Sequence, residues 1–183
     1  MPEAAVRLRP ATMADAAAMA EIHVGAWQTA FRGIVPDELL NALRPEEIVV
    51  RYREPLAAND AAAQRFIVAV SDRAVIGLVR CGATRDGDEG PACVGEVRSL
   101  YVRPTYWRQG VGRRLLHAAI EQLVADGFDT ATLWTLTASK QARAFYEALG
   151  WRLDGAVTEW EGVPRVRYRA QLSAADPVAG PAT

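Results

Sequence analysis

The 183-residue chain has little of what metal sites and disulfide frameworks are built from. It holds only two cysteines, Cys81 and Cys93, and two histidines, His23 and His117. No CxxC pair occurs, so the donors of a zinc site would have to be gathered from scattered positions. We therefore expect no bound metal, and two reduced, buried thiols rather than a disulfide.

An excess of one charge and long apolar runs are also missing. The formal net charge is −1, which gives no overall attraction to nucleic acid. No apolar run reaches the roughly 18 residues that a membrane span requires. The start of the chain, MPEAAVRLRP, lacks the basic-then-apolar layout of a signal peptide. We expect a soluble, cytoplasmic monomer or homodimer that binds neither nucleic acid nor membrane.

The sequence does have enough apolar material for one core. Half of its residues are hydrophobic, and its length suits one ordinary α/β domain. Neither an internal repeat nor a linker divides the chain. We predict a single domain over residues 1–172, followed by a flexible tail over residues 173–183.

Hydrophobic periodicity and turn residues predict the elements of this domain. The predicted strands are residues 6–9, 66–70, 74–81, 94–102, 131–136, 151–159 and 163–172. The last two are expected to form a hairpin around Glu161-Gly162. The first predicted helix begins after a near capping box at Thr12 and Asp15. Further helices are predicted over residues 37–43, 45–53 and 140–149, and from Gly110 to Gly127. This order predicts a mixed α/β fold with about seven largely antiparallel strands and four or five helices. It excludes a doubly wound nucleotide-binding fold.

The most informative segment is residues 96–116, EVRSLYVRPTYWRQGVGRRLL. Its strand ends near Val102, and Gly110-Val111-Gly112 opens a helix. Glycines let backbone N–H groups approach a ligand, and a helix start attracts anions. Arg108, Arg113 and Arg114 add positive charge, so the segment suits a diphosphate. A tight turn without a ligand is the alternative interpretation.

Two known nucleotide motifs do not fit this segment. The Rossmann fingerprint needs a third glycine where Leu115 stands. A Walker loop needs a lysine and a hydroxyl residue after Gly112, and neither follows.

Two motifs, in the right order, resemble the GNAT superfamily of acyl-CoA-dependent N-acyltransferases. The first resembles its acetyl-CoA signature, Arg/Gln-x-x-Gly-x-Gly/Ala after a strand ending in Val-x-Pro. Trp107 replaces the usual Arg or Gln of that signature, and Ser139 replaces the usual Asn of the second motif. The matching residues are Leu100, Val102, Pro104, Gly110, Gly112 and Leu115-Leu116 in the first motif, and Ala142, Phe145-Tyr146 and Leu149-Gly150-Trp151 in the second.

The resemblance covers about residues 6–172 and implies a GNAT fold whose sheet is splayed at the cofactor. It implies that the pantetheine arm of acetyl-CoA pairs with the backbone of Leu100, Tyr101 and Val102. The implied diphosphate site is formed by Arg108, Gln109, Gly110, Val111, Gly112 and Arg113, with a further cofactor contact at Ser139.

The implied reaction moves the acetyl group of acetyl-CoA to a primary amine of a small molecule or of a peptide or protein N-terminus. A non-catalytic acyl-CoA-binding sensor or scaffold is the alternative. A third interpretation, acetylation of aminoacyl-tRNA, is disfavoured by the near-neutral charge.

Attack of an amine on a thioester needs a base for the amine proton and an acid for the thiolate. Glu96 is the candidate base, since some family members carry a catalytic glutamate at the matching position. Two-residue alternation would place it on one face with Arg98, Leu100 and Val102; pairing with Arg98 or solvent is the alternative. Tyr146 is the candidate acid, and a packing role for its ring is the alternative.

The amine acceptor itself is not identified by the sequence. His23, Trp27 and Phe31, on the first long helix, are candidate substrate contacts. Trp134 and Trp160 suit either an acceptor pocket or the core. The alternation of Arg165, Arg167 and Arg169 predicts a solvated strand face, with the grip of an acidic acceptor as a weaker alternative.

Overall fold

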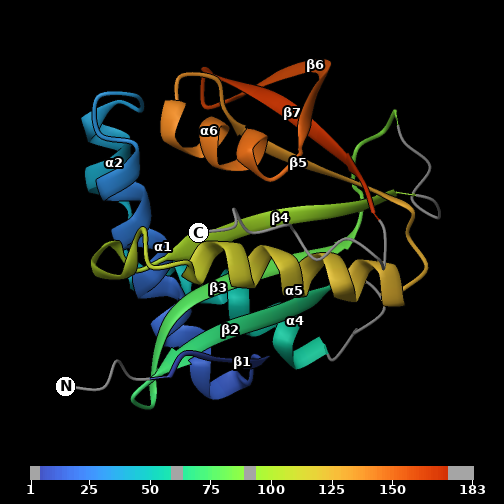
Figure 1. The fold of residues 1–183 in the computed structure, drawn as a ribbon. Coiled ribbons are helices and arrows are strands. Elements are labelled where there is room, and N and C mark those ends of the chain that lie inside the picture. Colours follow the sequence, from blue (N-terminus) through green and yellow to red (C-terminus); the bar gives the residue numbers. More distant parts are fainter. Residues whose placement is uncertain (1–4, 59–63, 89–93, 173–183) are drawn as a thin grey trace. The chain divides into compact units, whose positions relative to one another are not determined.

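The structure, a computed structural model, describes residues 5–58, 64–88 and 94–172 (Figure 1). Its elements are β1 (Arg7–Pro10), η1 (Met13–Asp15), α1 (Ala16–Ala30), α2 (Asp37–Ala42), α3 (Pro45–Ile48), α4 (Val50–Ala58), β2 (Arg65–Ser71), β3 (Ala74–Ala83), β4 (Val94–Val102), η2 (Pro104–Tyr106), α5 (Val111–Ala125), β5 (Thr130–Leu136), α6 (Lys140–Ala148), β6 (Arg152–Trp160) and β7 (Val163–Gln171).

The strands form a seven-stranded sheet in the order β1-β2-β3-β4-β5-β7-β6. Strands β4 and β5 are parallel, whereas β1–β2, β2–β3, β5–β7 and β7–β6 are antiparallel. The predicted mixed, largely antiparallel fold is therefore confirmed. The chain divides into two compact units, Met1–Gly82 with Val97–Ala119 and Ala83–Glu96 with Ile120–Thr183. Strand β4 and helix α5 each contribute residues to both units.

In the first unit, β1, β2 and β3 lie side by side (Figure 1). One face of these strands packs on the helices: Val68 and Leu78, which are cross-strand partners, share a core with Met19 and Ile22 of α1. The opposite face packs on α5, where a Cβ added to Gly77 would lie 2.9 Å from a Leu115 methyl carbon. Gly77 is therefore required by this close helix approach.

Helix α1 begins as the sequence predicts. The backbone N–H and the hydroxyl of Thr12 donate to the Asp15 carboxylate at 2.7 and 2.9 Å, and the predicted capping box is present at the start of η1, which leads into α1. The two Arg9 Nη atoms donate to the same carboxylate at 2.7 and 2.8 Å. These hydrogen bonds, with that of Arg9 the largest cause, lower the pKa of Asp15 from 3.8 to about 2.

The predicted helix at residues 45–53 is instead two helices, α3 and α4, and α4 continues to Ala58 with Pro55 inside it. The Tyr52 N–H bonds to the Val49 carbonyl, a tighter i to i−3 contact at the junction. Tyr52 is buried in the core beside α1. Burial of its ring, rather than helix propensity, explains why this charged segment is held in place.

In the second unit, the start of β4 pairs in parallel with β5, and β7 pairs with both β5 and β6. The predicted turn of the β6–β7 hairpin is present, with Glu161 and Gly162 at φ +47° and +73°. A Cβ on Gly95 would lie 2.8 Å from the Leu123 side chain, so β4 packs closely on the end of α5. Helix α6 lies against the sheet through Tyr146 and Tyr168 (Figure 1).

Two sequence predictions fall partly or wholly on residues that the structure does not describe. Cys81 is buried, as predicted, but Cys93 and the tail at residues 173–183 lie outside the described ranges. No helix within those ranges is both long enough and apolar enough to span a membrane.

Candidate active site

The turn before α5 has the backbone geometry of an anion site. Arg108 and Gly110 have left-handed conformations, with φ of +62° and +79°. The first backbone bond of the helix runs from the Arg114 N–H to the Gly110 carbonyl. Within the described ranges, the backbone N–H groups of residues 108–113 have no hydrogen-bond acceptor. Alternating left-handed residues that present successive free N–H groups form a concave donor set, which suits phosphate oxygens.

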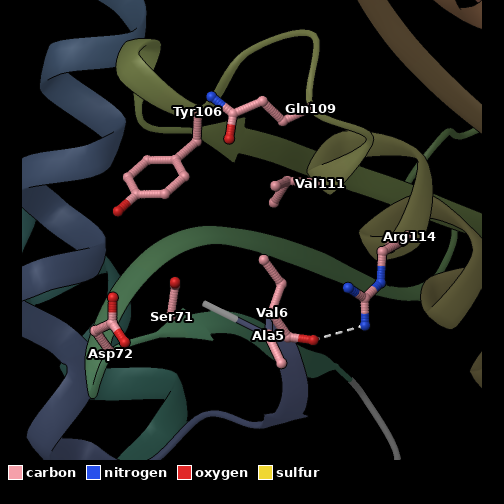
Figure 2. A pocket seen from close by; sticks show the side chains of 8 residues that line it. All are labelled: Ala5, Val6, Ser71, Asp72, Tyr106, Gln109, Val111 and Arg114. Atoms are coloured by element: carbon pink, nitrogen blue, oxygen red, sulfur yellow. Dashed lines mark hydrogen bonds between the residues drawn. The ribbon is translucent and has the colours of Figure 1, made fainter. Parts of the chain in front are cut away.

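Two side chains at this turn, Gln109 and Arg114, already make hydrogen bonds within the first unit. They border a cavity of about 400 Å³ next to the turn between β2 and β3 (Figure 2). Gln109 donates to the Thr105 carbonyl at 3.0 Å, and Arg114 donates to the Val6 carbonyl at 2.8 Å. Phosphate binding by the turn would therefore depend on its backbone and on the exposed Arg108 and Arg113. The cavity is lined by Ala5, Val6, Ser71, Asp72, Tyr106, Gln109, Val111 and Arg114.

Trp107, where the GNAT signature has Arg or Gln, braces this turn. Its indole N–H donates to the Val102 carbonyl at 2.7 Å and so ties the turn to the end of β4. The Val102 carbonyl, within the stretch expected to pair with pantetheine, thus already accepts one hydrogen bond. This role of Trp107 depends on a side-chain-to-backbone contact that no sequence pattern indicates.

The expectation that Glu96 shares a face with Val102 is wrong. Val102 lies on the α5 side of the sheet with Gly77 and Leu115. Gly95 also faces α5, through Leu123. Gly95 and Val102 are seven positions apart, so strict alternation would place them on opposite faces. Both face α5, so the alternation is interrupted between them. Glu96 therefore points away from α5, whereas Val102 points toward it.

Glu96 is buried, with 5 % of its surface exposed. The Arg85 backbone N–H and Nε both lie 3.3 Å from its Oε2, and Arg85 Nη2 lies 3.4 Å from its Oε1. The Arg85 side chain is 62 % exposed. Glu96 is therefore shielded from solvent and ion-paired, whereas its partner Arg85 remains exposed.

The loop that carries Arg85 is fastened by side chains of its own unit, the second. Arg167 binds the carboxylates of Asp86 at 3.1 Å, Asp88 at 2.8 Å and Asp154 at 2.7 Å. The Trp134 indole N–H also donates to Asp86, at 3.0 Å. Hydrogen bonds to these carboxylates, foremost that of Asp88, raise the pKa of Arg167.

Arg167 is thus not part of the predicted solvated face: only 5 % of it is exposed. Its partners lie about 80 positions earlier in the chain and on the adjacent strand, which local alternation does not reveal.

Tyr146 is half-buried on α6 within an aromatic group. Its ring centroid lies 5.2 Å from that of Phe145, 6.3 Å from that of Trp151 and 6.2 Å from that of Tyr168. Ser139, the other prediction near this helix, is buried at the helix N-cap. The roles of Tyr146 as acid and of Ser139 as a cofactor contact stay predictions.

The candidate acceptor residues come together in the first unit. His23 Nδ1 lies 2.9 Å from the Tyr52 hydroxyl, and the His23 ring stacks on Tyr101 with centroids 4.5 Å apart. Burial, with the nearby charge of Arg51, lowers the pKa of His23 to about 4, so the imidazole is neutral at pH 7.

Trp27 lies 5.7 Å from the His23 ring and 5.0 Å from the ring of Phe31. Neutral His23 can orient Tyr101 and Tyr52, but it cannot supply a positive charge to a ligand.

The model of the acetyltransferase (GNAT) family matches residues 27–151, which is most of the chain. The chain belongs to the GNAT acetyltransferase family. The matched region of this GNAT protein includes Glu96, the turn before α5 and Tyr146. Among the described residues, no group of three or more His, Cys, Asp or Glu side chains is placed to hold a metal ion.

Named relatives agree with this family. The probable N-acetyltransferase Rv2775 of Mycobacterium tuberculosis is 27 % identical over 174 residues, covering 92 % of this chain and 95 % of that protein. YuaI of Bacillus subtilis, an uncharacterized N-acetyltransferase, is 28 % identical and covers 78 % of each chain.

Solved structures share the fold. PaiA N-acetyltransferase from Thermoplasma acidophilum, in complex with coenzyme A, superposes with a TM-score of 0.74 at 16 % identity, covering 89 % of this chain and 98 % of that one. Salmonella typhimurium yncA, with its cofactor acetyl-CoA, gives a TM-score of 0.69 at 22 % identity, with 96 % and 99 % covered.

Proposed function

We propose that this GNAT protein transfers the acetyl group of acetyl-CoA to a primary amine, carried by a small molecule or by a peptide or protein N-terminus. The observation that carries the proposal is the turn before α5, with its left-handed Arg108 and Gly110 and its free N–H groups. Such a donor set suits the diphosphate of coenzyme A. The coenzyme A and acetyl-CoA named with PaiA and yncA support the same donor.

The pantetheine arm would extend along β4. Among the described residues, β4 pairs with β5 only at Val94, Gly95 and Glu96, although β4 continues to Val102. The backbone of residues 100–102 is therefore available to an extended ligand beside it, apart from the Val102 carbonyl that Trp107 occupies.

In the proposed reaction the amine nitrogen attacks the thioester carbonyl carbon. The C–N bond forms, and the C–S bond breaks. Glu96 takes the amine proton, directly or through a water, and the Tyr146 hydroxyl gives a proton to the departing thiolate. The Arg85 partner of buried Glu96 is 62 % exposed, so solvent reaches the edge of this ion pair, which supports the route through a water.

The test is acetyl-CoA binding and thiol release over a panel of amines, with Gly110→Glu as the variant. A glutamate there would place an anion beside the donor N–H groups, so acetyl-CoA affinity should fall at least 100-fold. Gly127→Glu is the matched control: both glycines have positive φ, +79° and +92°, and open space at Cβ. The two variants should therefore lose similar stability, and the control should bind acetyl-CoA normally.

Unchanged affinity in Gly110→Glu, measured by calorimetry, would end the proposal for this turn. Tight acetyl-CoA binding by the wild type with no thiol release from any amine would instead favour the sensor or scaffold alternative.

A further inference from the structure

Strand β7 carries three arginines on one face, and only one lacks a carboxylate partner in the described ranges. Arg167 binds Asp86, Asp88 and Asp154, and Arg169 binds Asp154. No carboxylate of the described residues pairs with Arg165. The Arg165 Nε is buried and has no hydrogen-bond acceptor there. A buried N–H donor without an acceptor is costly unless a ligand supplies one.

An aromatic surface orients this arginine. The Arg165 guanidinium carbon lies 5.5 Å from the centre of the Trp134 ring, a cation–π distance. The Trp134 indole is itself held, because its N–H donates to Asp86. A planar guanidinium held against a fixed ring is suited to a carboxylate, which it can bind through two parallel hydrogen bonds.

Strand register places Arg165 on the same face as the candidate base. Glu96 pairs with Thr132, and Thr132 pairs with Arg169 across the next ladder. Thr132, Trp134 and Leu136 share one face of β5, and Leu136 pairs with Arg165 of β7. Glu96, Trp134 and Arg165 therefore all face the same side of the sheet in the second unit.

We propose that Arg165 binds a carboxylate of the amine acceptor, so that the substrates are amines carrying a carboxylate several bonds away. This inference rests on the proposed function. By strand spacings, the Cα atoms of Glu96 and Arg165 lie on the order of 16 Å apart. Their side chains shorten this gap without closing it. An α-amino acid, whose amine and carboxylate share one carbon, is too short to use both residues, whereas an ω-amino acid or a short peptide can span them.

The experiment compares amines that differ only in the charge of the far group. The probes are 5-aminopentanoate against 5-aminopentanamide, and glycylglycine against glycylglycinamide. Wild-type kcat/KM should be about 10- to 100-fold higher for each carboxylate than for its amide, mainly through KM. Arg165→Met should remove this preference and leave the amides unchanged. Arg165→Lys should recover only part of it, because lysine lacks the planar fork.

Arg7→Met is the matched control, since it removes the same charge from an exposed residue of β1. It should keep the carboxylate preference. Equal rates for acid and amide in the wild type, or a preference that survives in Arg165→Met, would overturn the role of Arg165 while acetyl transfer stands.

Equilibrium binding of the same probes separates this inference from the proposed function. If no amine is acetylated, but 5-aminopentanoate binds more tightly than its amide and loses that advantage in Arg165→Met, then the carboxylate site stands and acetyl transfer fails. If neither transfer nor selective binding occurs, both are wrong.

Discussion

Replacing Asp15 by asparagine should destabilise the protein by about 2 kcal/mol at neutral pH. The pKa of Asp15 is about 2 instead of 3.8, and each pKa unit corresponds to about 1.4 kcal/mol. The full difference is therefore about 2.4 kcal/mol, and solvent around Arg9, which is 43 % exposed, reduces it slightly. Asparagine can still accept from Thr12, so the change removes mainly the charge interaction with Arg9.

The pH dependence follows from the direction of the pKa change. A carboxylate whose pKa is lowered by folding stabilises the folded state above its unfolded pKa, and this contribution is lost as the pH falls through the folded pKa. The difference between wild type and Asp15→Asn should be complete above about pH 5, about half as large at pH 3, and small below pH 2.

Urea denaturation followed by tryptophan fluorescence at pH 7 and pH 3 measures this difference. Asp37→Asn is the control, because Asp37 lies 3.9 Å from Arg32 with both side chains about 60 % exposed. That variant should change the stability by less than about 0.5 kcal/mol at either pH. An Asp15→Asn variant no less stable than the control at pH 7, or equally destabilised at both pH values, would refute the reasoning.

Two further predictions concern the chemistry. Glu96→Gln should lower kcat/KM about 100-fold or more at pH 7 and recover much of it at alkaline pH, where the amine deprotonates unaided; a loss that is constant with pH in the pH–rate profile would indicate a structural role. Tyr146→Phe keeps the ring packing and should lower kcat about 10- to 1000-fold, with little change in acetyl-CoA affinity and a smaller loss for a more activated thioester; wild-type turnover under chemistry-limited conditions would make Tyr146 a packing residue.

Local patterns predicted those features that local chemistry determines. The capping box of Thr12 and Asp15 and the hairpin turn at Glu161-Gly162 are set by residues a few positions apart. The helix start after Gly110 is likewise predicted locally, because a glycine pair between a strand and an amphipathic segment is typical of a turn that opens a helix. The order of the elements follows from the same periodicities.

The remaining features depend on contacts that no short window contains. The left-handed conformation of Arg108 and the bond from Trp107 to Val102 arise from the folded turn. The break in the alternation of β4 shows only in what Gly95 and Val102 touch. Likewise, Arg85 lies 11 positions before Glu96, so neither residue marks the other as its partner.

The fastening of residues 84–88 by Arg167 has a consequence for biosynthesis. Arg167 lies in β7, whereas its partners Asp86 and Asp88 are made about 80 residues earlier. A nascent chain therefore contains Glu96 and Arg85 long before it contains Arg167, which secures the loop of Arg85. A chain that ends before β7 keeps the whole donor turn but lacks this fastening, so the surroundings of Glu96 are completed only after β7 has been made.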